Sequence, residues 1–139
     1  MELEVFEILE QFSQQSTRND KIKLLKANNI PALRDVCRGS YDGNIEWNLP
    51  PGKPPYTPNR PESVPSTLRK EHRNFGFYVK GFKKSEGIPA YKRENMFIQL
   101  LESIHAEDAL IVLNMVGKKP PVKGLTKKIV EEAFPNLLS

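Results

Sequence analysis

The sequence predicts an all-α fold, a small multi-helix bundle that spans residues 1–139 as a single domain. Apolar residues recur at three- and four-residue spacing in several windows, which is the period of a helix with one buried face. Helix caps and stops flank these windows. Seven of the 12 prolines lie between residues 40 and 65, where their density excludes a helix or a central strand. The expected bundle therefore carries a long proline-rich loop between its N-terminal and C-terminal helices.

Three short helices are expected before this loop. The first covers residues 3–12, where apolar side chains alternate in helical period with glutamates. The second starts at one of several possible N-caps near Thr17 and ends at the asparagine pair 28–29. The third covers residues 30–38, has a proline in its first turn and is expected to stop at Gly39. The short connections force these helices to pack as neighbours.

The proline-rich loop, residues 40–65, contains Tyr41, Trp47 and Tyr56. Aromatic rings bury much apolar surface, so we expect them to hold an extended chain against the core. The composition also fits a disordered linker, because proline-rich segments bury little apolar surface of their own. Both interpretations stay open at this point.

The helices expected after the loop are 67–75, 89–105, 106–116 and 126–134. Gly76 is the expected end of the first of them, and the residues from there to 88 fit either helical or extended chain. The middle two form an αα-hairpin, in which Leu110 and Leu113 are expected to face the core. Phe134 and Leu137 are expected to anchor the last helix in that same core.

The side chains that usually carry catalysis are scarce. His72 and His105 are interpreted as surface or capping residues, and Cys37 as a small core residue. One cysteine and two histidines do not give the ligand spacing of a zinc site, and no glycine-rich phosphate loop occurs. The adjacent acids Glu107 and Asp108 fit the first turn of a helix. We therefore expect a protein without enzymatic activity, metal or cofactor.

The single cysteine cannot form an internal disulfide, and Met1 is followed by an acidic amphipathic segment in place of a signal sequence. No window approaches the roughly 18 uninterrupted apolar residues of a membrane span. These features predict a cytoplasmic protein with no membrane partner.

Basic residues are concentrated in the second half of the chain. Residues 1–65 carry 8 basic and 9 acidic side chains, whereas residues 66–139 carry 13 basic and 8 acidic ones. The candidate phosphate-binding residues here are Arg69, Lys70, Arg73, Lys80, Lys83, Lys84, Lys118, Lys119, Lys123, Lys127 and Lys128. Such clusters attract phosphates, although a solvated lysine-rich surface is an equally common reason for them.

The turn before the last helix raises the functional interpretation. Gly124 permits close approach, Thr126 caps the helix, and Lys127 and Lys128 stand in its first turn. Free amides at a helix N-terminus bind anions, so this turn is a candidate clamp for a backbone phosphate.

The stretch from Gly124 to Pro135, GLTKKIVEEAFP, resembles the closing segment of the N-terminal DNA-binding domain of small viral ATP-dependent DNA ligases of the T-even phage type. The resemblance extends to the helical pair at 89–116, to the opening helix and to the second helix with Lys21, Lys23 and Lys26. Residues 40–65 do not match well. The likeness implies an all-helical domain that grips duplex DNA around a nick through the minor groove and backbone.

In that family a following adenylation domain does the chemistry, with a nucleophile motif Lys-x-Asp-Gly. Here Tyr41, Asp42 and Gly43 supply the end of this motif, but Ser40 stands at the lysine position. The resemblance thus implies a free-standing DNA-binding domain without ligase activity, encoded by a tailed phage and acting in the host cytoplasm.

The primary hypothesis is a sequence-nonspecific binder of double-stranded DNA, intact or nicked, that serves replication, repair or packaging. The alternative is a protein-interaction module of the same fold that docks on a phage or host replication, transcription or virion protein; Trp47 and the proline-rich loop favour it. An enzyme of unrecognised type is a distant third. One basic stripe joining the two clusters would favour DNA, and scattered charges would favour protein.

Overall fold

The computed structural model describes residues 2–138 of the chain, and within them it contains helices and no strand. The elements are α1 (Val5–Gln14), α2 (Arg18–Ala27), α3 (Pro31–Tyr41), α4 (Leu68–Glu71), the 3-10 helix η1 (His72–Tyr78), α5 (Lys83–Glu86), α6 (Ala90–Ser103), α7 (Ala106–Val116) and α8 (Lys127–Ala133). The predicted all-α bundle with a long non-helical segment in its middle is confirmed. None of these helices combines the length and the apolar character that a membrane span requires.

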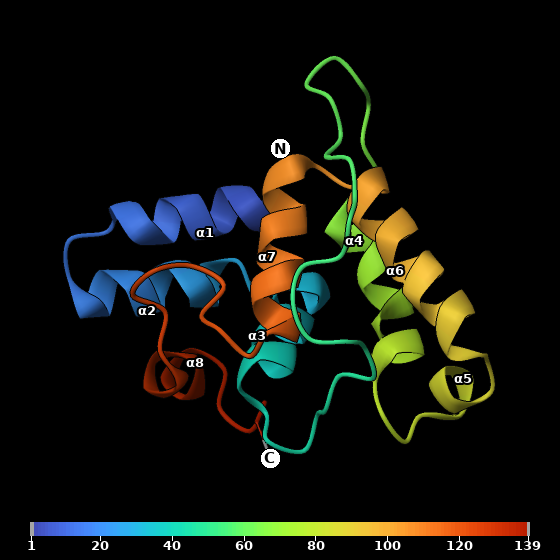
Figure 1. Ribbon diagram of the computed structural model, residues 1–139. Coiled ribbons are helices and arrows are strands. Elements are labelled where there is room, and N and C mark those ends of the chain that lie inside the picture. Colours follow the sequence, from blue (N-terminus) through green and yellow to red (C-terminus); the bar gives the residue numbers. More distant parts are fainter. Residues whose placement is uncertain (1, 139) are drawn as a thin grey trace.

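Helix α7 stands at the centre of the bundle. It packs against α1, α3 and α6, while α2 and α8 pack together on one side and α4, η1 and α5 gather on the other (Figure 1). Fully buried side chains from separate helices meet in one core, among them Ile8 of α1, Leu33 of α3, Leu101 of α6 and Val112 of α7. The apolar face that the periodicity predicts for each helix thus packs against a neighbouring helix.

The prediction that Gly39 ends the third helix is wrong, because α3 continues through it to Tyr41. A Cβ atom at this position would lie 2.6 Å from the ring of Trp47 and 2.7 Å from the sulfur of Met115. The Gly39 carbonyl also accepts a hydrogen bond of 3.0 Å from the indole nitrogen of Trp47. This glycine therefore makes room for a tryptophan.

The same contact anchors the proline-rich segment, as the sequence predicted. Trp47 lies edge-on to Phe75 and forms an isolated antiparallel bridge with Val79. The backbone amide of Asn48 donates to the Tyr78 carbonyl at 2.6 Å. An extended chain held by side-chain and backbone contacts is therefore the interpretation that the structure favours over a linker. Farther along, the segment projects from the body of the molecule (green in Figure 1).

Helical structure does not end at Gly76, because η1 carries it to Tyr78. Helix α6 lies within two residues of its predicted bounds, and α7 matches them. The prediction for Leu110 is wrong: its side chain is 47% exposed, while Ile111, Val112 and Met115 are buried. Helix α7 is apolar almost all round, so periodicity alone could not tell its buried face from its outer face.

The last helix is fixed as predicted. Thr126 caps α8 by accepting a hydrogen bond of 3.3 Å from the amide of Ile129. Phe134, at the end of the helix, is buried in the common core and Leu137 is partly buried against it. This anchoring holds the preceding basic turn in a defined place on α2.

Candidate nucleic-acid interface

The packing of α8 on α2 gathers basic residues from two distant parts of the chain. We call them the α2–α8 surface: Arg18, Lys21, Lys23, Lys26, Lys123, Lys127 and Lys128, with the turn at Gly124. All of these lysines are exposed except Lys21, which is partly covered because its ammonium lies 5.0 Å from the centre of the Phe12 ring. The sequence named the six lysines as candidates, and helix packing brings the two groups to one side of the molecule.

Gly124 connects the two groups. Its φ of +91° lies in the left-handed region that glycine adopts without strain. A Cβ added there would lie 3.8 Å from the ammonium nitrogen of Lys21, which shows how closely the α2 lysine approaches the turn. The next residue, Leu125, is buried, and its carbonyl accepts a hydrogen bond from the Tyr41 hydroxyl. The buried Leu125 and its hydrogen bond with Tyr41 therefore hold the turn in place.

Acidic residues reduce the charge of this surface only in part. Glu132 pairs with Arg18, an ion pair whose two side chains are about half exposed, and the hydrogen bond from Arg18 lowers the pKa of Glu132. Asp20 and Glu131 are the other acids on α2 and α8. Seven basic side chains against three acidic ones leave an excess equal to the net +4 of the whole chain, so the rest of the molecule is balanced.

The phosphate clamp expected at the start of α8 stays a prediction, and the structure shows which groups remain free for it. The hydroxyl oxygen of Thr126 accepts a hydrogen bond from the amide of Ile129, which is one of the first-turn amides that a phosphate would need. Helix α8 is also short, with seven residues. Lys123, Lys127 and Lys128 are exposed beside the turn. Any phosphate affinity of this turn therefore rests on lysine side chains more than on the helix terminus.

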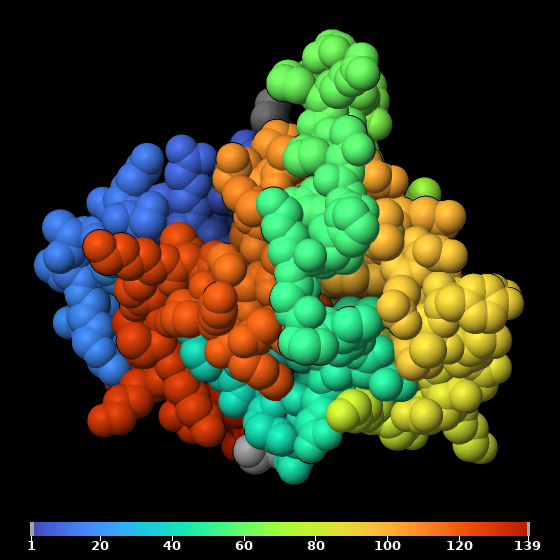
Figure 2. Space-filling view, viewed as in Figure 1, coloured from blue at the N-terminus to red at the C-terminus, as the bar shows by residue number. Residues whose placement is uncertain are grey.

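The second predicted group lies elsewhere. We call it the α4–α5 group: Arg69, Lys70, Arg73, Lys80, Lys83 and Lys84. Figure 2 shows the atoms of α2 and α8, in blue and red, adjoining on one side of the molecule and those of α5, in yellow, on the opposite side. The part of this second group that lies on α5 is therefore separate from the α2–α8 surface.

Several members of the α4–α5 group serve the fold. Arg69 donates two hydrogen bonds, of 3.0 and 2.7 Å, to the Leu3 carbonyl and ties α4 to the segment before α1. The ammonium of Lys84 donates to the Arg73 carbonyl and lies 5.1 Å from the centre of the Phe77 ring. Lys80 lies 3.8 Å from Glu46.

The buried Arg93 near this group is an interior residue. Its guanidinium donates to the carbonyls of Asn48, Ser85 and Ile88 at 2.8, 2.8 and 3.3 Å. It thereby ties α6 to the proline-rich segment and to α5. Nothing in its sequence neighbourhood separates this arginine from the exposed Lys92 before it.

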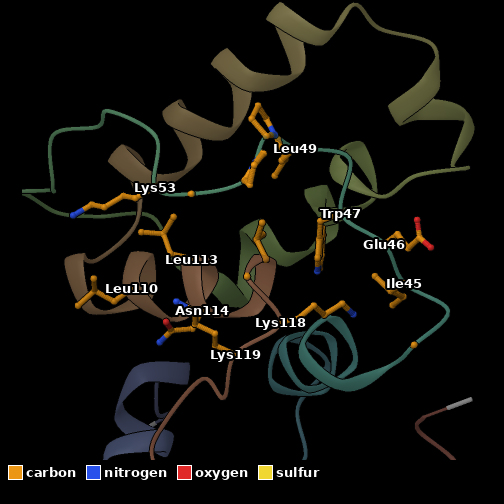
Figure 3. A pocket seen from close by; sticks show the side chains of 16 residues that line it. Ile45, Glu46, Trp47, Leu49, Lys53, Leu110, Leu113, Asn114, Lys118 and Lys119 are labelled. Carbon is orange, nitrogen blue, oxygen red and sulfur yellow. The ribbon is translucent and has the colours of Figure 1, made fainter.

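Lys118 and Lys119 belong to neither surface. They stand at the edge of a groove of about 910 Å³ between the proline-rich segment and α7 (Figure 3). The ammonium of Lys118 donates to the Asp42 carbonyl at 2.9 Å, and desolvation lowers its pKa. Sequence reasoning missed this groove, because its two walls are about 60 residues apart in the chain.

The groups that sequence reasoning set aside as non-catalytic lie in structural roles. His105 caps α7 by accepting from the amide of Glu107 and stacks on Phe6, and His72 contacts Asp35 at 2.6 Å. Burial raises the pKa of Cys37 to about 12. No group of side chains suited to a metal ion occurs among residues 2–138.

Asp108 is the residue whose role the sequence did not reveal. Its place in the first turn of α7 was expected, but its side chain is 1% exposed and accepts a hydrogen bond of 3.2 Å from the Phe6 amide of α1. Burial, and then the charge of Glu4, raise the pKa of Asp108 to about 7. The carboxyl thus joins α1 to α7 at a cost that depends on pH.

Comparisons with known proteins bear on the family of this chain. No curated protein and no solved structure matches it. A family of unknown function, DUF6433, matches residues 8–120, which run from α1 through α7 to the edge of the groove. The match includes the α2 lysines and ends before the turn at Gly124. Because it covers most of the sequence, the chain belongs to the DUF6433 family.

Proposed function

We propose that the chain is a non-catalytic protein that binds double-stranded DNA without reading its sequence, through the α2–α8 surface. The proposal rests on the packing that brings lysines from two distant parts of the chain together. Lys21 and Lys26 come from α2, and Lys123, Lys127 and Lys128 come from α8 and the turn before it. The packing of α8 on α2 joins them into one basic patch beside a glycine that has no side chain to obstruct approach.

Phosphate neutralisation is the chemistry that such a patch supports. Each lysine that meets a phosphate releases condensed counterions from the duplex, and this release supplies most of the free energy of nonspecific binding. Base reading in the major groove most often uses arginine, whose fork matches two acceptors of guanine. The only arginine of this surface, Arg18, is already paired with Glu132. The patch therefore suits the DNA backbone better than the base edges.

The resemblance to the DNA-binding domain of small viral ligases supports the same surface. Its moderately specific motif contains Gly124, Lys127 and Lys128, and the matched second helix contains Lys21 and Lys26. The missing nucleophile at Ser40 supports a protein that binds without adenylating itself and needs no cofactor. Incubation with labelled ATP should leave the chain unlabelled, and a covalent adenylate would overturn the non-catalytic part of the proposal.

A salt-titrated binding measurement on intact duplex, nicked duplex and single-stranded DNA tests the proposal. Duplex affinity should fall steeply with salt, with a slope of log affinity against log salt of about −0.9 for each phosphate contacted. Duplexes of unrelated sequence should bind with the same affinity. A slope near zero, or no duplex binding at low salt, would reject DNA as the ligand.

The alternative function, a protein-interaction module, is favoured by a separate observation: the groove beside α7 has a largely apolar lining, to which no residue of the α2–α8 surface contributes. Trp47 lines this groove, while its indole nitrogen donates to the Gly39 carbonyl and its ring lies edge-on to Phe75.

A further inference from the structure

We propose that the groove beside α7 binds an acidic amphipathic helix of a partner protein. We call it the α7 groove: its walls are residues 43–53 of the proline-rich segment, the outer side of α7 and residues 117–119. Its volume of about 910 Å³ is that of a site for several side chains. The inference is independent of DNA binding, because none of the α2–α8 lysines lines it.

The lining of the groove is largely apolar. Leu113 and Val116 of α7 line the groove together with Leu49 of the proline-rich segment, and Figure 3 shows Leu49 and Leu113 facing the hollow. Leu110 stands at its lip with 47% of its surface in water. Exposed apolar area in a concave, polar-edged site is typical of surfaces that bind another protein. Covering it with apolar side chains of a partner would gain hydrophobic free energy.

The hollow continues beyond this groove in both directions. A smaller cavity of about 200 Å³ lies under prolines 50–55 against α6 and shares Leu49 and Val116 with the groove. On the other side of α7, Leu110 and Asn114 also line a hollow of about 580 Å³ that reaches α1. The accessible strip therefore crosses α7 and is longer than a single side chain needs. A segment of polypeptide suits it better than a small metabolite.

The edge of the groove sets the charge of the partner. Lys53, Lys118 and Lys119 line it, and the one acid among the lining residues, Glu46, lies 3.8 Å from the ammonium of Lys80. Three lysines around an apolar floor complement a segment that alternates apolar and acidic residues. Desolvation already lowers the pKa of Lys118, so an incoming carboxylate would stabilise its charged form.

The backbone at Lys118 supports a role for this edge. Its φ of 57° is left-handed, a conformation that is unfavourable for a residue with a Cβ and that glycine adopts freely. The amides of Lys118 and Lys119 donate to the carbonyls of Met115 and Asn114 at 3.0 and 2.8 Å, which closes the end of α7. A strained lysine stands where glycine would be easiest, and such outliers cluster at binding sites.

The proline-rich wall favours a helical partner over an extended one. Pro50 and Pro51 have no amide hydrogen, so this wall cannot pair with an added strand. A partner must then be held by its side chains, as in complexes where a helix lays its apolar face in a groove. Apolar residues at three- and four-residue spacing would reach Leu110 and Leu113, with carboxylates directed to the lysines.

A displayed library of random 16-residue peptides, selected on the full chain and counter-selected on Leu110→Glu, tests the proposal. The enriched peptides should be acidic, with apolar residues at positions i, i+3, i+4 and i+7. No enrichment over the counter-selection, or enrichment of basic peptides or of peptides without this spacing, would overturn it.

Titration of the most enriched peptide then assigns the surface. Leu110→Glu should weaken binding at least about thirtyfold, because it replaces an apolar contact by a charge that repels an acidic partner. Lys53→Glu with Lys119→Glu should weaken it about tenfold. The matched variant Lys70→Glu with Lys83→Glu should bind as the parent does, and its failure to do so would overturn the groove assignment. Equal thermal midpoints show that Leu110→Glu folds; if it does not, Leu110→Ser takes its place.

Binding measurements on variants of the two surfaces distinguish peptide binding in the groove from DNA binding at the α2–α8 surface. Lys127→Glu with Lys128→Glu should reduce binding of a 20-base-pair duplex and leave the peptide affinity unchanged. If the duplex instead displaces the peptide and Leu110→Glu abolishes duplex binding, the groove is a nucleic-acid site and the peptide proposal is wrong.

Discussion

The α4–α5 region and the α2–α8 surface are both rich in cations, but two arginines in or beside the first are hydrogen-bonded to backbone carbonyls of the fold. In the first, Arg69 donates to the Leu3 carbonyl and the neighbouring Arg93 to three carbonyls in the interior. On the second, Lys123, Lys127 and Lys128 extend into solvent. Cations that look alike in the sequence therefore differ in what they cost to change: replacing Arg69 or Arg93 should lower stability, whereas replacing the exposed lysines of the α2–α8 surface should lower binding.

The first prediction concerns the anchor that supports the α2–α8 surface. Phe134→Ala should lower the free energy of unfolding by about 3–5 kcal/mol, because it leaves a cavity where the buried ring ends α8. Urea denaturation measures the loss. Phe82→Ala is the matched control, since its ring is half exposed and should cost far less. Equal stability of the two variants would mean that α8 is a loose end and cannot fix a binding surface.

The second prediction tests whether cations near the α4–α5 group hold the fold. Arg93→Ala should cost at least about 3 kcal/mol of unfolding free energy, because it leaves the carbonyls of Asn48, Ser85 and Ile88 without their donor. Lys92→Ala, its exposed neighbour on α6, should stay within about 0.5 kcal/mol of the parent. Chemical denaturation of both variants measures the two changes in unfolding free energy. Similar effects would contradict the distinction between the two regions.

Local signals in the sequence explain why the helices could be predicted. Thr17 and Thr126 are N-caps, and each occurs beside a periodic apolar run. The boundaries of α6 and α7 follow from the same kind of information. Gly39 was misinterpreted because its role is set by Trp47 and Met115, which approach from elsewhere in the chain. A glycine that admits a ring and a glycine that ends a helix look identical in sequence.

The candidate sites, too, depend on contacts between residues that are far apart in the sequence. The lysines of α2 and α8 were named one by one, but only helix packing reveals that they share a surface. Arg93 follows the exposed Lys92 in the sequence, but its guanidinium reaches carbonyls up to 45 residues away. The α7 groove could not be anticipated either, because its walls come from two segments and its lip, Leu110, had been assigned to the core.

The third prediction extends the comparison to acids, between buried Asp108 and exposed Glu107 on the same turn. The folded-state pKa of Asp108, about 7, lies above its ordinary value of 3.8, so folding favours the protonated carboxyl. Its ionisation therefore costs nothing well below pH 4, costs more as the pH rises to about 7, and costs a constant amount above that. The groups that raise this pKa besides burial are Glu4, Glu7 and Glu107.

Asp108→Asn should consequently stabilise the protein at pH 8 and have little effect at pH 4. The rise in the pKa of Asp108 from 3.8 to about 7 sets an upper bound of about 4 kcal/mol, and we expect a gain of about 2 kcal/mol at pH 8. The amide oxygen of asparagine can still accept from the Phe6 amide. Urea titrations across this pH range measure the difference. Glu107→Gln should change little with pH, and a pH-independent effect of Asp108→Asn would show that its carboxyl is uncharged or hydrated throughout.

The central claim is that duplex DNA binds the α2–α8 surface, and paired charge reversals test it most directly. Lys127→Glu with Lys128→Glu and Lys70→Glu with Lys83→Glu remove the same charge from exposed positions of the two regions. The measurement is the slope of log affinity against log salt for a duplex. The first pair should weaken binding and flatten the slope by about 0.9 per lost phosphate contact, while the second pair leaves the slope at the parent value. Equal slopes in the parent and the first pair, or a loss confined to the second, would contradict the account.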